Sequence, residues 1–347
     1  MDVETLGEKL VFLISQPRGG STLLQRVLAG HPEIYTISEP WLLLHPLYAL
    51  RSEGYEAEYD QRQALRGMKN FLKSLADGED EYMEALRRMY SYLYGRALEA
   101  SGKRYFLDKT PRYYLIISEL HRLFPKATFI ILLRNPLAVL CSILNSWIQG
   151  KWYSFHQFKH DLIDAPQLIL KGIDALKTNC LIIHYEYFLN HPEGETRRIC
   201  NKMKIGFEPK MIEYGQSNLP QWDLGDKDGI NKYSRPAPER ADKWVESLSD
   251  PQVWRLADDY LKLLGPTTFK QMGYSYEEQQ EKLIANKPGT IDRLLTFTLS
   301  EALKYPLKNS IYSRGMISLL ISIQQQGFFG IAKTVIRKVT GALARTK

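Results

Sequence analysis

Cysteine is scarce in this sequence, and its scarcity excludes two kinds of site. Only three cysteines occur among the 347 residues, Cys141, Cys180 and Cys200, with no Cys-x-x-Cys pair and an odd total. Disulfide frameworks need even sets of cysteines, and structural zinc sites need closely spaced ligand pairs. We therefore expect no disulfide scaffold and no zinc centre, and a reducing compartment fits this composition better.

A long apolar run is also missing. A bilayer span needs about 18 or more predominantly apolar residues, and the longest uncharged stretch, residues 315–332, is interrupted by three glutamines and two glycines. The first ten residues, MDVETLGEKL, have neither the basic start nor the apolar stretch of a secretion signal. The sequence predicts a cytoplasmic protein.

Strand-like and helix-like segments alternate along most of the chain. Residues 127–133 (ATFIILL) form an uninterrupted apolar run, typical of a strand inside a parallel sheet that helices cover on both faces. Other short strands are predicted at residues 9–15, 34–37, 104–107 and 181–184, and residues 41–100 read as a helical insertion. The pattern predicts an α/β fold with a doubly wound parallel sheet and a helical cap.

The first predicted strand runs into a glycine loop and then a helix. The loop reads Gln16-Pro17-Arg18-Gly19-Gly20-Ser21-Thr22. Glycines allow close backbone approach, the helix N-terminus attracts an anion, and an arginine can pair with two anionic oxygens. We interpret the segment as a P-loop-like phosphate-binding loop, although a tight turn with Ser21 as a helix cap would use the same residues. The GxxxxGK[ST] pattern of magnesium–triphosphate sites is absent.

A second anion-binding element follows the apolar strand at residues 127–133. Arg134 ends that strand, and Ser142 stands about two turns into the helix that follows, in the segment LLRNPLAVLCSIL. Together the two side chains could hold one anion at the end of the sheet. Taken singly, each is explained as well by a surface arginine or by a serine bonded to its own helix.

With both elements present, the sequence resembles the sulfotransferase superfamily. QPRGGSTLL and LLRNPLAVLCSIL are similar to the two signatures that bind 3′-phosphoadenosine-5′-phosphosulfate (PAPS) in that superfamily. Residues 108–111 (DKTP), residues 185–186 (YE) and residues 225–230 (GDKDGI) add looser matches in the same order. The resemblance covers roughly residues 9–265 and is to bacterial small-molecule members related to tyrosylprotein and trehalose sulfotransferases.

The resemblance implies a role for each matching residue. The phosphate loop, Arg18, Gly19, Gly20, Ser21 and Thr22, would hold the 5′-phosphosulfate. The 3′-phosphate would bind Arg134 and Ser142, and the adenine would lie near Tyr185, with Trp41 or Trp244 as stacking partners. Lys227 either closes over the donor or is a solvated loop residue.

The catalytic residues follow from the same resemblance. Glu39, after the second strand, would be the general base that takes the proton of an acceptor hydroxyl. Arg18 and Lys109 would stabilise the charge on the sulfuryl group and on the leaving oxygen. An alternative for Glu39 is a surface carboxylate that caps a helix or pairs with a cation. No metal is demanded.

The sequence therefore predicts an enzyme that moves a sulfuryl group from PAPS to a small-molecule acceptor and releases 3′-phosphoadenosine-5′-phosphate (PAP). Whether the acceptor offers a hydroxyl or an amine stays open. Two alternatives are a small-molecule kinase that uses ATP, which the missing GK[ST] disfavours, and a nucleotide-binding protein without catalysis.

The C-terminal tail differs in charge from the rest of the chain. After Glu301 no acidic residue occurs, whereas eight basic residues do, so the net charge of +7 belongs to the tail. We expect a sulfotransferase domain over residues 1–285 and a basic helical extension over residues 286–347. For the extension, contact with a membrane surface, a carrier domain or a second copy, and plain packing on the enzyme, all stay open. No nucleic-acid partner is expected.

Overall fold

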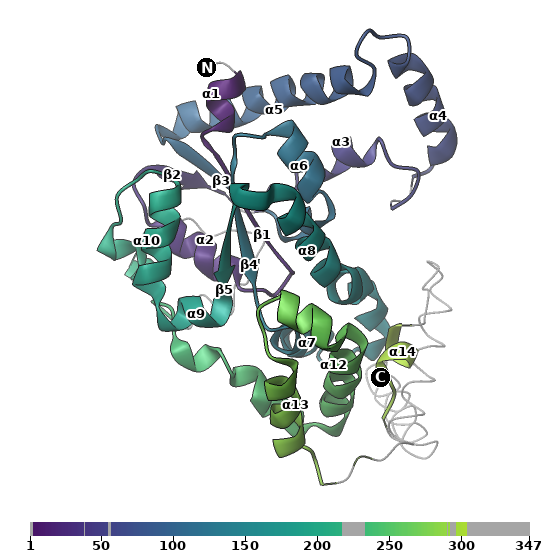
Figure 1. Ribbon diagram of the computed structural model, residues 1–347, viewed down its shortest axis with the longest axis vertical. Helices are drawn as coiled ribbons and strands as arrows, with labels where there is room; N and C mark the ends of the chain where they lie inside the picture. Colours follow the sequence, from purple (N-terminus) through teal and green to yellow (C-terminus); the bar gives the residue numbers. More distant parts are fainter. Residues whose placement is uncertain are drawn as a thin grey trace, which may run out of the picture. The chain divides into compact units, whose positions relative to one another are not determined.

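Five parallel strands form one sheet in the order β2-β3-β1-β4-β5 (Figure 1). The strands are β1 (Leu10–Ser15), β2 (Ile34–Thr36), β3 (Tyr105–Lys109), β4 (Thr128–Leu133) and β5 (Cys180–His184). Every residue of β1 and of β3 is buried, as expected for strands with a neighbour on each side and helices over both faces. The predicted doubly wound α/β fold is confirmed.

The computed structural model describes residues 3–37, 39–54, 57–216, 233–289, 291 and 296–303. These belong to two compact units. The first consists of Met1–Arg134 with Gln167–Pro238, and the second of Asn135–Pro166 with Glu239–Lys347. The sheet belongs to the first unit.

The strand order reverses direction at β1. From β1 the chain passes to β2 and β3 on one side, and then crosses to β4 and β5 on the other. Ligands of open α/β sheets bind outside the carboxyl ends of the strands at such a switch point. Because all five strands run parallel, the residues that follow β1, β2, β3 and β4 leave the sheet at the same edge.

Helices cover the two faces of the sheet from different parts of the sequence. The side chains of β3 alternate, as in any strand: Phe106 contacts the ring of Tyr94 on α5 (Glu79–Ser101) at 4.9 Å between centroids, and Lys109 lies by Thr22 on α2 (Ser21–Ala29). Helices α2 and α5 therefore lie on opposite faces of β3. Further helices of this unit are α1 (Val3–Gly7), α6 (Ile117–Leu123), α9 (Tyr185–Asn190) and α10 (Pro192–Lys202).

The described residues of the predicted helical insertion contain three helices. They are α3 (Leu44–Tyr48), α4 (Gln61–Leu72) and the 23-residue α5. Helix α4 begins at Asp60, whose carboxylate accepts from the backbone N–H groups of Arg62 and Gln63. Helix α5 ends at Gly102, in the left-handed conformation that glycine adopts without strain. Helix α5 also packs against α1, beside which it lies in Figure 1, and against α6.

Strand β3 is longer than the sequence predicts. The expected strand ended at Leu107, but Asp108 and Lys109 continue it and pair with Phe12 and Leu13 of β1. Aspartate and lysine are unfavourable in strands when taken alone. The backbone bonds to β1 keep them in the sheet, and they become consecutive residues on opposite faces.

The described part of the second unit contains helices and no strand. Its helices are α7 (Pro136–Ile143), α12 (Pro251–Gln271), α13 (Tyr276–Ala285) and α14 (Leu299–Leu303), and α8 (Ala165–Leu176) begins in this unit. Helix α7 continues as a π-helical turn at Leu144–Ile148. Helices α12, α13 and α14 follow residue 238 in the described part of the chain. The boundary at residue 285 stays a prediction, because residues 290, 292–295 and 304–347 lie outside the described part. No described helix is both long and apolar enough to cross a membrane.

Candidate active site

The loop between β1 and α2 has an unusual backbone that its glycines and arginine produce. Arg18 has φ 65° and Gly20 has φ 92°, so both lie in the left-handed region. The N–H of Gly19 donates to the carbonyl of Gln16 at 2.9 Å, and a Cβ on Gly19 would stand 2.8 Å from that same oxygen. Gly20 precedes α2 and places no side chain over its N-terminus, which leaves that end suited to an anion.

Tyr185 and Arg134 lie against this loop. A Cβ on Gly20 would stand 2.3 Å from Cε2 of Tyr185, so the buried tyrosine ring occupies the place of a side chain. The guanidinium of Arg134 lies over the same ring at 4.5 Å from its centroid. Its Nη1 donates to the carbonyl of Arg18 at 2.8 Å. Residues from after β1, after β4 and after β5 therefore meet at the carboxyl edge of the sheet.

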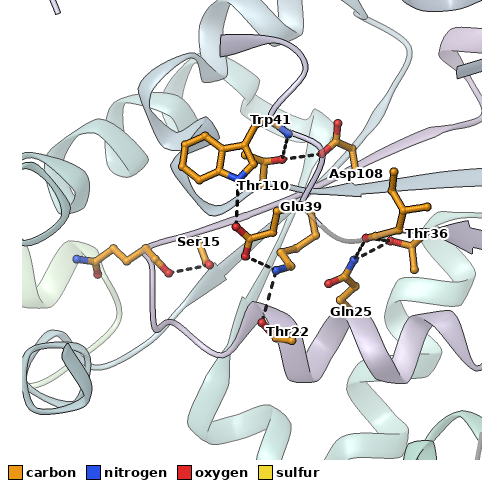
Figure 2. A network of polar contacts seen from close by, with 11 residues as sticks. Ser15, Thr22, Gln25, Thr36, Glu39, Trp41, Asp108 and Thr110 are labelled. Carbon is orange, nitrogen blue, oxygen red and sulfur yellow. Dashed lines mark hydrogen bonds and ion pairs between the residues drawn. The ribbon is translucent and has the colours of Figure 1, made fainter. Parts of the chain in front are cut away.

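Glu39, Lys109 and Thr22 form a polar cluster beside the loop, in which Figure 2 labels Glu39 and Thr22. Nζ of Lys109 lies 2.6 Å from Oε1 of Glu39 and 3.5 Å from Oγ1 of Thr22. The side chains of Lys109 and Glu39 are 1% and 12% exposed. Burial of a lysine is tolerated when an opposite charge compensates it. Strands β2 and β3 pair Thr36 with Leu107. Because Glu39 and Lys109 follow these two residues closely, the pairing brings their side chains together.

Trp41 holds the other oxygen of the glutamate. Its indole Nε1 donates to Oε2 of Glu39 at 3.3 Å. The guanidinium of Arg112 lies 5.6 Å from the centroid of the indole. The sequence suggested Trp41 as a stacking partner for an adenine, whereas the structure places its N–H on the carboxylate of Glu39 (Figure 2).

A second buried carboxylate, that of Asp108, lies on the other face of β3. It is 1% exposed and accepts bonds from the hydroxyls of Tyr94, Thr110 and Tyr113. Burial raises the pKa of the Asp108 carboxyl to about 6, while the three hydroxyls and Lys109 act in the opposite direction. Asp108 does not contact Glu39, yet its hydroxyl partners contact the segment that follows Glu39.

The remaining predicted site residues are placed as follows. Ser21 and Thr22 are buried in the first turn of α2. Ser142 is half-buried on α7, in the second unit, so only Arg134 of the predicted 3′-phosphate pair belongs to the unit that contains the loop. Lys227 lies outside the described residues. Within the described part of the chain, no group of three or more His, Cys, Asp or Glu side chains could hold a metal ion.

Comparison with known proteins decides the family. A sequence model described as "Sulfotransferase family" matches residues 11–209, more than half of the chain. The chain belongs to the sulfotransferase family. The match begins in β1 and therefore includes the loop, Glu39, Lys109, Arg134 and Tyr185.

The chain is similar to individual proteins of known sequence or structure. The nodulation protein NoeE of Sinorhizobium fredii is 36% identical over 313 residues, covering 82% of this chain and 69% of the relative. Protein-tyrosine sulfotransferase A of Caenorhabditis elegans is 23% identical over 220 residues, and this match covers 59% of this chain and 52% of the relative. Among solved structures, the sulfotransferase domain from the curacin biosynthetic pathway has a TM-score of 0.48 at 21% identity, over 76% of this chain and 97% of that domain.

Three features of this sulfotransferase were not assigned from the sequence. They are the indole bond from Trp41 to Glu39, the hydroxyl cluster around Asp108, and the bond from Gln25 of α2 to the carbonyl of Ile37, at 2.8 Å. The hydroxyl cluster around Asp108 had one signal in the sequence, the aspartate of DKTP. An aspartate that continues a buried strand must find hydrogen-bond donors. The bond from Gln25 to Ile37 joins α2 to the end of β2, and the bond from Trp41 to Glu39 accompanies the left-handed backbone of Trp41; no local sequence pattern indicates either.

Proposed function

We propose that this sulfotransferase moves the sulfuryl group of PAPS to a hydroxyl of a small-molecule acceptor, with Glu39 as general base. The oxygen of the acceptor attacks sulfur in line with the leaving oxygen. The new O–S bond forms as the S–O bond to the 5′-phosphate breaks, the hydroxyl proton passes to Glu39, and PAP leaves. Lys109 and Arg18 stabilise the charge that develops on the transferred and leaving oxygens.

The residues at the carboxyl edge of the sheet suit a donor with two anionic ends. Arg18 and the N-terminus of α2 favour a phosphosulfate. Nε of Arg134 is buried and has no hydrogen-bond partner among the described residues, which supports a ligand acceptor for this guanidinium. Tyr185, whose ring packs on Gly20, is the residue that we assign to the neighbourhood of the purine. When bound, PAPS supplies the activated sulfuryl group.

One observation carries the proposal. The cation of Lys109 lies between the carboxylate of Glu39 and the hydroxyl of Thr22 in the first turn of α2. A base, a cation and a phosphate-loop hydroxyl thus share one small region, as transfer from a bound donor to an incoming hydroxyl requires. The 3.3 Å contact at Oε2 of Glu39 is longer than the 2.6 Å contact at Oε1, so Oε2 is the oxygen that yields more easily to an acceptor.

Calorimetric titration with PAP tests the donor assignment, with AMP and ATP as controls and without magnesium. AMP lacks the 3′-phosphate, so a preference for PAP measures the recognition of that group. We expect PAP to bind at micromolar concentrations and AMP at least tenfold more weakly. Tighter binding of magnesium–ATP than of PAP in a parallel titration would instead favour a kinase.

The base is tested by Glu39→Gln, which keeps the shape of the side chain. Release of PAP from PAPS is measured with a panel of acceptors that includes a phenol, a sugar, a primary alcohol and an amine. We expect turnover with the most active acceptor to fall by about 10²–10⁴-fold, with little change in PAP affinity. The matched control is Glu33→Gln, because Glu33 is an exposed carboxylate that pairs with Arg104 at the surface. Equal turnover in both variants would remove Glu39 as the base.

A further inference from the structure

Asp108 stands directly behind the site on β3. Consecutive residues of a strand point to opposite faces, so Lys109 reaches Thr22 and Glu39 whereas Asp108 points toward Tyr94 on α5. Its carboxylate is 1% exposed. A buried carboxylate lowers stability unless several donors satisfy it, so its presence here calls for a reason.

Three hydroxyl groups donate to this carboxylate. Oδ2 accepts from Tyr94 at 2.6 Å and from Tyr113 at 3.2 Å, and Oδ1 accepts from Thr110 at 3.0 Å. A hydroxyl has one proton to donate and two lone pairs that accept. Because each proton is directed at Asp108, only the lone pairs of these three hydroxyls remain for other partners.

Two of the three hydroxyls use their lone pairs on the segment that follows Glu39. The backbone N–H of Trp41 donates to Oγ1 of Thr110 at 3.4 Å, and that of Leu43 donates to the hydroxyl of Tyr113 at 3.2 Å. Figure 2 shows the first of these links, from Asp108 through Thr110 to Trp41. The carboxylate thereby determines that both hydroxyls face the backbone as acceptors.

The anchored segment needs such support. Trp41 has φ 55°, a left-handed conformation that costs about 1–2 kcal/mol in a residue other than glycine. On the other flank of Glu39, the amide of Gln25 holds the carbonyl of Ile37 at 2.8 Å. The indole of Trp41 returns to Oε2 of Glu39, so the position of the Trp41 backbone sets the position of the donor that orients the glutamate.

We infer that Asp108 is a positioning residue for Glu39. The Asp108 carboxylate accepts the protons of Thr110 and Tyr113, so both hydroxyls accept hydrogen bonds from the backbone at residues 41–43. These bonds fix the loop that presents the carboxylate of Glu39 to the sulfuryl acceptor. The inference rests on the proposed role of Glu39 as base. Tyr94 is the third donor, but it satisfies the carboxylate from α5 and has no bond to residues 41–43 among those described.

The matched pair Tyr113→Phe and Tyr94→Phe tests this inference. Each variant removes one hydroxyl from the carboxylate of Asp108, but only Tyr113→Phe also removes the acceptor for the N–H of Leu43. In a second pair, Thr110→Val removes the hydroxyl that accepts from the N–H of Trp41, and Thr110→Ser keeps it. Three quantities are measured in the full chain: hydrogen exchange of the peptide that contains residues 41–43, kcat with the most active acceptor of the panel, and PAP affinity.

We expect Tyr113→Phe and Thr110→Val to speed exchange at residues 41–43 and to lower kcat, each by about 2- to 10-fold, the equivalent of one hydrogen bond. PAP affinity should stay within about twofold in both, since these residues are not part of the phosphate loop. Thr110→Ser should restore both quantities, and Tyr94→Phe should keep exchange at residues 41–43 near that of the parent.

Three results would overturn the inference. Tyr113→Phe and Tyr94→Phe could prove equal in exchange and in kcat, which would make the cluster purely structural. Exchange could rise in Tyr113→Phe with kcat unchanged, while turnover still falls in Glu39→Gln. The assignment of Glu39 as base would then be kept, but the positioning role of Asp108 would be overturned. Full turnover in Glu39→Gln would overturn the proposed base and the positioning role together.

Discussion

At the scale of single residues, the central feature is a pair of adjacent charges with separate surroundings. Asp108 and Lys109 are both 1% exposed, yet each makes its close polar contacts with other groups. Lys109 pairs with the carboxylate of Glu39, and Asp108 is satisfied by three hydroxyls. The alternation of strand side chains gives each charge its own partners, one set in the site and one behind it.

The titration of Asp108 makes stability depend on pH in a defined direction. Burial raises the pKa of its carboxyl from 3.8 to about 6. Between about pH 4 and pH 6 the folded protein therefore binds a proton that the unfolded chain has released. Stability falls with rising pH wherever the folded state binds more protons than the unfolded chain. Titration of Asp108 therefore lowers the free energy of unfolding as the pH rises through this window, by at most about 1.4 kcal/mol per pH unit. Above the window, its effect on the free energy of unfolding no longer changes with pH.

Urea unfolding of the parent and of Asp108→Asn between pH 4 and pH 8 measures this contribution. The amide does not titrate, so every other group cancels in the difference between the two proteins. We expect the parent to lose stability relative to the variant as the pH rises toward 6, and the two curves to run parallel above about pH 7. Curves that stay parallel from pH 4 upward would show that Asp108 titrates as an exposed aspartate does.

At the scale of elements, the strand–loop–helix from Leu10 to Ala29 is held by contacts with distant segments. Gly20 has a left-handed backbone and packs against the ring of Tyr185, and that ring lies under Arg134. The loop conformation is therefore coupled to residues that follow β4 and β5. A change at one glycine should act on the binding of the donor as well as on stability.

Gly20→Ala tests this coupling. The added Cβ would stand 2.3 Å from the ring of Tyr185 at a φ of 92°, so the ring must move and the backbone is strained. We expect a loss of about 1–3 kcal/mol in the free energy of unfolding and weaker PAP binding, measured by thermal denaturation and by calorimetry.

The control for this change is Gly194→Ala. Gly194 lies within α10, and a Cβ there meets nothing within 4 Å. Alanine has a higher helix propensity than glycine, so this variant in the first turn of α10 should keep or slightly gain stability and bind PAP as the parent does. Unchanged PAP affinity in Gly20→Ala would show that the packing of Tyr185 does not shape the donor site.

At the scale of the whole molecule, the sheet predicts how protection from exchange is distributed. Strand β1 has a neighbour on each side and six buried residues, whereas β5 is paired with β4 alone among the described strands and is mostly half-buried. Interior strands open only with the larger cooperative unit. Amides of β1 should therefore exchange more slowly than those of β5, by about tenfold or more, as measured by mass spectrometry of native protein. Equal rates would indicate that the sheet opens as one unit.

The sequence by itself determined the order of the elements and the chemistry at their ends. The apolar run at residues 127–133, the glycine loop at residues 16–20 and the arginine after β4 are local patterns, and local patterns encode strands, turns and charge. They predicted the parallel sheet, the phosphate-type loop and the family. Glu39, Lys109 and Arg18 were also named from the sequence, though their catalytic roles stay a proposal.

Only the tertiary structure decided which of these residues meet. It extended β3 through Asp108 and Lys109 because bonds to β1 outweigh the weak strand preference of two charged residues. It turned their side chains to opposite faces, and it joined Lys109 to Glu39, Trp41 to Glu39, and Asp108 to the loop beyond. The contact of Lys109 with Glu39 and that of Thr110 with Trp41 link residues about 70 positions apart. They depend on strand order and register, which arise when the sheet assembles and which no short stretch of sequence contains.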